Sequence, residues 1–172
     1  MAGCAEALFC EGEKRMGELT HFNAHGDAHM VNVEEKDDTR RVARACGTIY
    51  VGAEVFRAIA DGTARKGDVL GVARVAGIMG AKRTSELIPL CHIVPLTGCT
   101  LDFHLNEADY AVTAICEASC VGKTGVEMEA LTAVQIALLT IYDMCKAMNR
   151  EMMISECFLL EKDGGKSGHF VR

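Results

Sequence analysis

The chain has 172 residues, a usual size for one domain, and 49% of them are hydrophobic while 24% are charged. This composition is typical of a globular protein with a core and argues against disorder over most of the length. The formal net charge is −6, from 18 basic and 24 acidic residues, which argues against a protein that coats nucleic acids. No apolar run reaches the roughly 20 residues that a membrane span needs, so we expect neither nucleic acid nor membrane as a partner.

The start of the chain predicts a leader outside the fold. Residues 1–18 mix Gly, Glu, Lys and Ala without hydrophobic periodicity, so we expect them to be disordered and a single catalytic domain to occupy residues 19–172. The segment is too short and too acidic to resemble a secretory signal. Nine cysteines are present, an odd number that one chain cannot pair completely, and no two have Cys-x-x-Cys spacing. We interpret them as reduced thiols of a cytoplasmic protein without a metal site.

The first half of the chain predicts one strand followed by helices. Partial alternation favours a strand at residues 41–51, and helical spacing favours a short helix at 52–60. Residues 66–88 predict a longer helix, which Pro89 prevents from continuing. Its predicted apolar stripe consists of Val69, Leu70, Val72, Val75, Ile78 and Met79.

The second half predicts a hairpin, a long helix and a last strand. Alternating residues at 98–105 and 110–120 favour two strands with a hairpin connection. Thr124 and Glu127 match a capping box, which would open a helix that runs to about Met148.

Residues 152–161 predict the last strand. The order strand, helices, strand, strand, helix, strand is that of the split βαβ arrangement. We therefore expect an α+β, ferredoxin-like fold, with helices packed on one face of an antiparallel sheet.

Asp143 and Lys146 are the first candidates for chemistry. They lie three residues apart in the predicted long helix and are therefore neighbours on one face. Such a pair is either an ordinary exposed ion pair or a carboxylate and an amine at the edge of a pocket, tuned for proton transfer.

Two further segments allow a structural and a functional interpretation. Pro89 and Pro95 bracket Cys91-His92, which is either a tight connection or a restrained loop that holds His92. Lys123 and Thr124 follow a glycine at a predicted helix start, but Glu117 occupies the first glycine position of a P-loop. A helix start of this kind still favours an anion.

Long blocks of sequence carry a resemblance to a known family. They include Leu87-Ile88-Pro89-Leu90-Cys91-His92, residues 124–132 (Thr-Gly-Val-Glu-Met-Glu-Ala-Leu-Thr) and residues 140–147 (Thr-Ile-Tyr-Asp-Met-Cys-Lys-Ala). In this order they resemble the cyclic pyranopterin monophosphate synthase family of molybdenum cofactor biosynthesis. The resemblance covers nearly the whole chain from Leu19 onward.

The resemblance implies a lyase and an assembly. The substrate would be (8S)-3′,8-cyclo-7,8-dihydroguanosine 5′-triphosphate, and the products cyclic pyranopterin monophosphate and pyrophosphate. The chain would form a homohexamer, a trimer of dimers, with active sites at subunit interfaces. No resident cofactor is implied, and Mg²⁺ would at most accompany the triphosphate.

The resemblance also implies site residues. The catalytic pair would be Asp143 and Lys146. The substrate-binding residues would be Leu90, Cys91, His92, Met128, Glu129, Glu127, Lys66, Arg41 and Lys162.

The chain departs from the family pattern at two positions. Asn32 stands where the family has aspartate, and Ile93 stands where the family commonly has proline. The alternatives to an active enzyme are a non-catalytic nucleotide-binding oligomeric module and, because of Asn32, an inactive paralogue.

Overall fold

A computed structural model of the chain describes residue 25 and residues 27–166 and 168–172. It divides into two compact units, Met1–Val31 and Asn32–Arg172. The expected disordered leader at residues 1–18 lies outside the described residues, so that expectation stays a prediction. The elements below all belong to the second unit.

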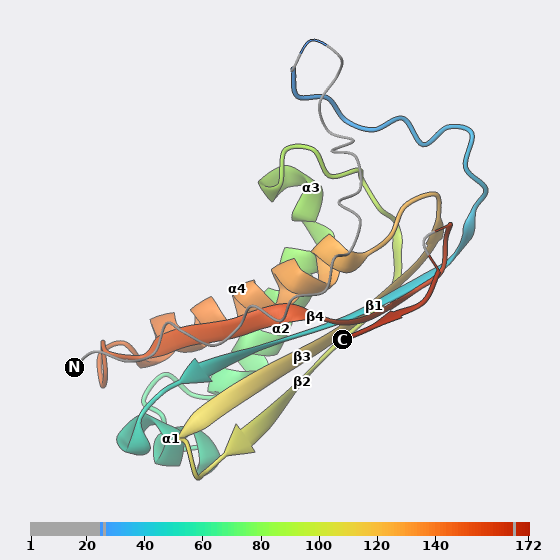
Figure 1. Cartoon of the computed structure of the whole chain (residues 1–172). Coiled ribbons are helices and arrows are strands. Elements are labelled where there is room, and N and C mark those ends of the chain that lie inside the picture. The colour runs from blue at the N-terminus through green and yellow to red at the C-terminus, as the bar shows by residue number, and fades with distance from the viewer. Residues whose placement is uncertain (1–24, 26, 167) are drawn as a thin grey trace. The chain divides into compact units, whose positions relative to one another are not determined.

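The second unit is built on a five-stranded antiparallel sheet with the strand order β2-β3-β1-β4-β5 (Figure 1). The strands are β1 (Thr39–Tyr50), β2 (Leu96–Asn106), β3 (Ala111–Gly122), β4 (Met153–Asp163) and the short β5 (Phe170–Val171). Apart from β5, this is the strand order of the ferredoxin-like fold, so the predicted fold class is confirmed. The four longer strands also match the strands that the hydrophobic alternation predicted.

Helices α2 (Val69–Lys82) and α4 (Glu127–Cys145) cover one face of the sheet (Figure 1). The other helices are α1 (Ala53–Ala60) and the single turn α3 (Thr84–Leu87). The core lies between α4 and the inward side chains of the sheet, such as Ala45 and Ile49 of β1, which are both fully buried. Cys116 and Cys120 of β3 belong to this core as small apolar residues, and the seven described cysteines are all free thiols.

The bounds of α2 differ from the expected helix at residues 66–88. Asp68 caps the helix, because its side chain accepts a hydrogen bond of 2.8 Å from the backbone N–H of Gly71. The helix therefore begins at Val69, and Arg83 interrupts it before α3.

The predicted apolar stripe of α2 is only partly correct, since Val69 is buried and Leu70 packs against the core but the other large residues are less buried. Val72, Val75 and Met79 are 48%, 64% and 42% exposed, whereas small residues on the other side of the helix are buried. The reason is the close approach of α4. A Cβ atom at Gly77 would lie 2.8 Å from the backbone oxygen of Ala133, so only a small residue fits between the helices.

The capping box predicted at the start of α4 is wrong. Glu127 is the first helical residue, so Thr124 lies too early in the chain to cap the helix, and the N-cap is Val126 without a side-chain hydrogen bond. The helix ends at Cys145 rather than near Met148, and Lys146 is its C-cap. Among the described helices, α4 is the one whose length and composition would allow a membrane crossing, but half of its apolar window is buried in the fold, as in a core helix.

Candidate functional site

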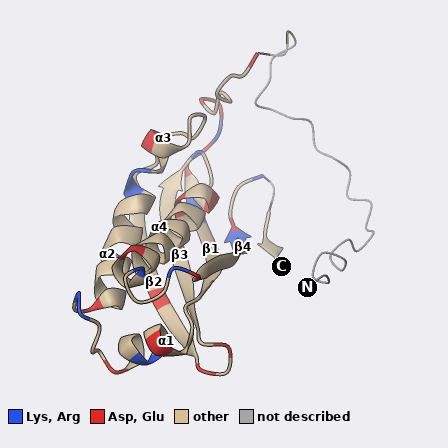
Figure 2. Ribbon diagram, turned by 90° about the vertical axis from the view of Figure 1, so that its left-hand side faces the viewer, with Lys and Arg blue, Asp and Glu red and all other residues tan. Residues whose placement is uncertain are grey.

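A cationic pocket of about 520 Å³ lies at the N-terminal end of α4. It is bounded by the segment that enters β1, the connection from β3 to α4, and the loop that follows β4. Five basic and two acidic side chains line it, so the pocket carries a positive balance in an acidic protein. The lining residues are Lys36, Asp37, Thr39, Arg41, Lys123, Thr124, Gly125, Glu127, Lys162, Gly164, Gly165 and Lys166. Figure 2 shows basic residues in the connecting segments, including the loop after β4.

Arg41 is the buried cation of this pocket. It is 9% exposed, and its guanidinium donates to the backbone oxygens of Gly122 (3.2 Å) and Lys123 (3.5 Å). The loop after β4 packs directly on it, since a Cβ atom at Gly165 would overlap the guanidinium. Gly164 and Gly165 also have φ angles of 97° and 80°, which favour glycine. Arg41 is thus held in place by two segments, and these two bonds use only part of its five donors.

The first turn of α4 places two carboxylates beside this pocket. Glu127 lines the pocket, and Glu129 is 4% exposed. Burial raises the pKa of the Glu129 carboxyl, and the charge of Glu127 raises it further. Burial, and then the charge of Glu129, raise the pKa of the Cys91 thiol. Cys91, in the segment after α3, therefore lies near this carboxylate. Met128, between the two carboxylates, is 38% exposed.

The expected loop residues follow α3 directly. Leu90, Cys91 and His92 are all half-buried in this segment. Ile93 is 87% exposed, so its side chain packs little against the rest of this chain. Any direct contact of Leu90 and His92 with substrate stays a prediction.

A second polar cluster lies at the C-terminal end of α4. The Nζ atom of Lys146 lies 2.6 Å from Oδ1 of Asp143, and the Nζ atom of Lys66 donates to the backbone oxygen of Asp143 (3.1 Å) and lies 3.8 Å from Oδ2. The hydrogen bond from Lys146, then its charge, and then the charge of Lys66 lower the pKa of Asp143. The cluster is therefore a carboxylate held in its ionised form between two exposed ammonium groups.

One chain does not bring the two clusters together. Glu127 and Asp143 lie 16 residues apart on the same helix. At 1.5 Å per residue, their backbones are separated by about 24 Å. Of the site residues expected from the sequence, Arg41, Glu127 and Lys162 line the pocket, whereas Lys66, Asp143 and Lys146 lie at the opposite end of α4.

Three basic residues that line the pocket, Lys36, Lys123 and Lys166, are absent from the site residues expected from the sequence. Lys123 and Lys166 are adjacent to glycines at a helix start and in a Gly-rich tail, a pattern that signals anion binding only weakly. Lys36 carries no signal at all, because it lies in a polar turn and reaches the pocket only through the fold.

Asn32 retains a structural role at its position. Its Oδ1 atom accepts a hydrogen bond of 2.7 Å from the backbone N–H of Glu34, and Lys36 N–H donates to the backbone oxygen of Val33 in the turn that follows. An aspartate would accept the same bond, so the substitution preserves this turn. In the part of the chain that the structure describes, no group of three or more His, Cys, Asp or Glu side chains could hold a metal ion.

Comparisons with known proteins find relatives that cover most of the chain. The MoaC family model matches residues 30–165. A protein of Heliobacterium modesticaldum named cyclic pyranopterin monophosphate synthase is 57% identical over 157 residues, which cover 91% of this chain and 99% of the relative. A protein of the same name from Thermoanaerobacter sp. is 54% identical over 154 residues, covering 90% and 98% of the two chains.

Proposed function

This chain belongs to the MoaC family, and we propose that its reaction site is shared between two copies of the chain. Its activity is cyclic pyranopterin monophosphate synthesis, a lyase reaction of molybdenum cofactor biosynthesis. The proposed substrate is (8S)-3′,8-cyclo-7,8-dihydroguanosine 5′-triphosphate, which yields cyclic pyranopterin monophosphate and pyrophosphate.

The separation of the two clusters carries the proposal of a shared site. A nucleoside triphosphate is shorter than the distance of about 24 Å along α4, so one chain cannot apply both clusters to one molecule. A second copy that places its Asp143 end against the pocket of the first would complete the site. Exposed apolar side chains on α2 and α4 support such packing, and these are Val72, Val75, Met79 and Leu139. We propose a homohexamer arranged as a trimer of dimers.

The pocket suits the phosphate part of the reaction. A hydroxyl of the ribose-derived ring attacks the α-phosphorus, and the bond from this phosphorus to the bridging oxygen breaks, so that pyrophosphate leaves. Negative charge spreads over the phosphate oxygens in the transition state, which fixed cations stabilise. We assign Arg41 and Lys162 to this role, with His92 as a further phosphate ligand. Lys66, which lies beside Asp143, would reach the phosphates only from the second copy. Any Mg²⁺ would enter bound to the triphosphate.

The Asp143 cluster suits the ring rearrangement. Rebuilding the purine-derived ring system as a pyranopterin needs repeated proton transfers. Lys146 and Lys66 lower the pKa of Asp143, so its carboxylate is ionised near neutral pH but is a weak base that accepts a proton only from a strongly acidic group. The Lys146 ammonium, 2.6 Å away, can return one.

The reaction itself is the direct test. Purified protein is incubated with the cyclic triphosphate, and pyrophosphate and the cyclic product are measured. We expect turnover by the wild type and its loss in Asp143→Ala with the oligomer intact. Asp102→Ala is a matched control, because it removes another exposed carboxylate that faces a cation, Arg74, at 3.7 Å. Wild-type-like turnover by Asp143→Ala would contradict the assignment.

The same assay decides between the enzyme and its alternatives. A non-catalytic nucleotide-binding module would bind the triphosphate without releasing pyrophosphate. An inactive paralogue would gain activity in Asn32→Asp, whereas we expect little change, because Asn32 already makes the hydrogen bond to Glu34. The described cysteines are free thiols, which supports the proposal of a cytoplasmic protein.

A further inference from the structure

The loop that closes the pocket lies between β4 and the C-terminal strand. Gly164, Gly165 and Lys166 line the pocket, and β5 follows a few residues later. Strand β5 is short: two of its residues pair with β4, and the N–H of Arg172 donates to the backbone oxygen of Leu160 (2.9 Å). The position of the loop therefore depends on how firmly this short strand is held.

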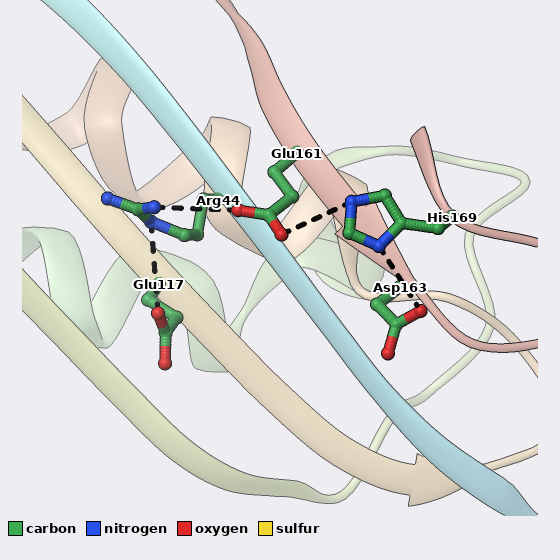
Figure 3. Close-up of polar contacts among 5 residues, drawn as sticks. All are labelled: Arg44, Glu117, Glu161, Asp163 and His169. Carbon is green, nitrogen blue, oxygen red and sulfur yellow. Dashed lines mark hydrogen bonds and ion pairs between the residues drawn. The ribbon is translucent and has the colours of Figure 1, made fainter. Parts of the chain in front are cut away.

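A row of alternating charges crosses the sheet at this point (Figure 3). Arg44 of β1 is paired in register with Glu117 of β3 and with Glu161 of β4, and its guanidinium lies 3.8 Å and 3.5 Å from their carboxylates. His169, just before β5, extends the row. Its Nε2 atom lies 3.4 Å from Oε1 of Glu161, and its Nδ1 atom lies 3.7 Å from Oδ1 of Asp163.

The two carboxylates that face His169 flank Lys162 in β4. Because successive side chains of a strand point to opposite faces, Glu161 and Asp163 share one face of the sheet and Lys162 points to the other. Lys162 lines the pocket from that opposite face. By contacting both neighbours, His169 ties the end of β4 to β5 across the back of the pocket-lining lysine.

We propose that His169 is a positioning residue of the anion pocket: it clamps Glu161 and Asp163 and so holds Lys162 and the Gly164–Lys166 loop in place for phosphate. The inference rests on the proposed phosphate-binding role of the pocket. Position 169 faces two carboxylates: a histidine or an arginine there can contact both, whereas a glutamate would add a third negative charge. The neighbouring cations are already engaged, since Arg44 lies 3.5 Å from Glu161 and Arg172 stacks on Phe158 at 4.4 Å.

A charge series at position 169 tests the clamp. Inorganic pyrophosphate is titrated calorimetrically into the oligomeric protein carrying His169→Arg, His169→Ala or His169→Glu. We expect the arginine variant to bind like the wild type, and the Kd to rise about two- to five-fold in the order Ala then Glu, as for the loss of exposed ion pairs. With the complete substrate we expect KM to rise and kcat to fall in the same order, because Lys162 is assigned both to phosphate binding and to the transition state.

Glu117→Gln is the matched control. It removes an ion pair at the other end of the same row, where Arg44 keeps Glu161 as its partner, so the Kd for pyrophosphate should stay at the wild-type value. An equal effect of Glu117→Gln and His169→Ala would show a general loss of sheet stability and overturn the clamp.

A second measurement separates the clamp from the function of the pocket. Amide hydrogen exchange at residues 164–166 should accelerate in His169→Glu and stay slow in His169→Arg. If the wild type binds no pyrophosphate but exchange follows this order, the phosphate-binding role fails and the clamp stands. If neither exchange nor affinity distinguishes the three variants, the clamp is wrong.

Discussion

Lys146 donates a hydrogen bond of 2.6 Å to Asp143 at the last turn of α4, and Lys66 reaches the same residue from the loop before α2. The sequence separation of three residues explains the first contact, because residues i and i+3 are neighbours on a helix. The second contact joins residues that lie 77 positions apart in the chain. Together they place one carboxylate between two ammonium groups, about 24 Å along the helix from the cationic pocket.

The first prediction concerns the ionisation of Asp143. Its pKa is lowered mainly by Lys146, through the hydrogen bond and then the charge, and less by Lys66. In an NMR titration we expect its carboxyl carbon to titrate below the usual range of aspartate. Lys146→Ala should move the midpoint upward toward that range, and Lys66→Ala should move it less. An unchanged midpoint in Lys146→Ala would show that the two groups are not in contact in solution.

The second prediction tests the shared site by complementation. Asp143→Ala and Lys162→Ala each disable one cluster, and each should be inactive alone. When the two variants are co-expressed with different tags, about half of the interfaces are mixed, and each mixed interface holds one intact site of two. Pyrophosphate release should then recover to roughly a quarter of the wild-type rate. A control that mixes the purified variants without subunit exchange should stay inactive, and no recovery on co-expression would contradict a site shared between two copies.

The third prediction concerns the buried carboxyl of Glu129. Its folded-state pKa is raised by burial, so the folded chain binds more protons than the unfolded chain between the ordinary and the raised pKa. Stability therefore falls as the pH rises through this window, and Glu129→Gln should not show this loss. The Tm of the glutamine variant should match the wild type near about pH 4 and exceed it near about pH 7. Parallel Tm curves for the two proteins would contradict the raised pKa.

The fourth prediction concerns the thiol pair between β2 and β3. The Sγ atoms of Cys99 and Cys116 lie 3.8 Å apart, and the pKa of Cys99 is lowered by the hydrogen bond from Cys116 and then by the charge of Lys82. Iodoacetamide should therefore label Cys99 faster than Cys91, whose thiol pKa is raised by burial. Peptide mass spectrometry should show slower labelling of Cys99 in Cys116→Ala and no change in Cys120→Ala, which removes another buried thiol of the same strand.

The fifth prediction concerns the packing of α2 on α4. A Cβ atom at Gly77 would lie 2.5 Å from Cδ1 of Leu101 and 2.8 Å from the backbone oxygen of Ala133. Gly77→Ala should therefore lower the free energy of unfolding by about 1–3 kcal/mol, although alanine is the better helix former. Urea denaturation measures the change. A more stable alanine variant would show that the helices can separate without cost.

Patterns along short stretches of sequence predicted the strands, because the alternation of a strand depends only on neighbouring residues. The alternation in β1 and in the β2–β3 hairpin follows the two-residue period of a strand, so these strands were confirmed within a few residues. The same reasoning was wrong for the buried face of α2. Its large apolar residues, Val72 and Val75, are exposed, while Gly77 is buried because α4 approaches so closely.

The amino-acid sequence alone determined the order of the elements, the family and the adjacency of Asp143 and Lys146, because each depends on spacing along the chain. The net charge of −6 likewise argued against nucleic acid, but it said nothing about one local surface. The tertiary structure decided that Arg41, Lys123 and Lys162 converge on a pocket from three separate segments. It also decided that this pocket and Asp143 lie at opposite ends of one rigid helix, since only folding sets distances between residues far apart in sequence.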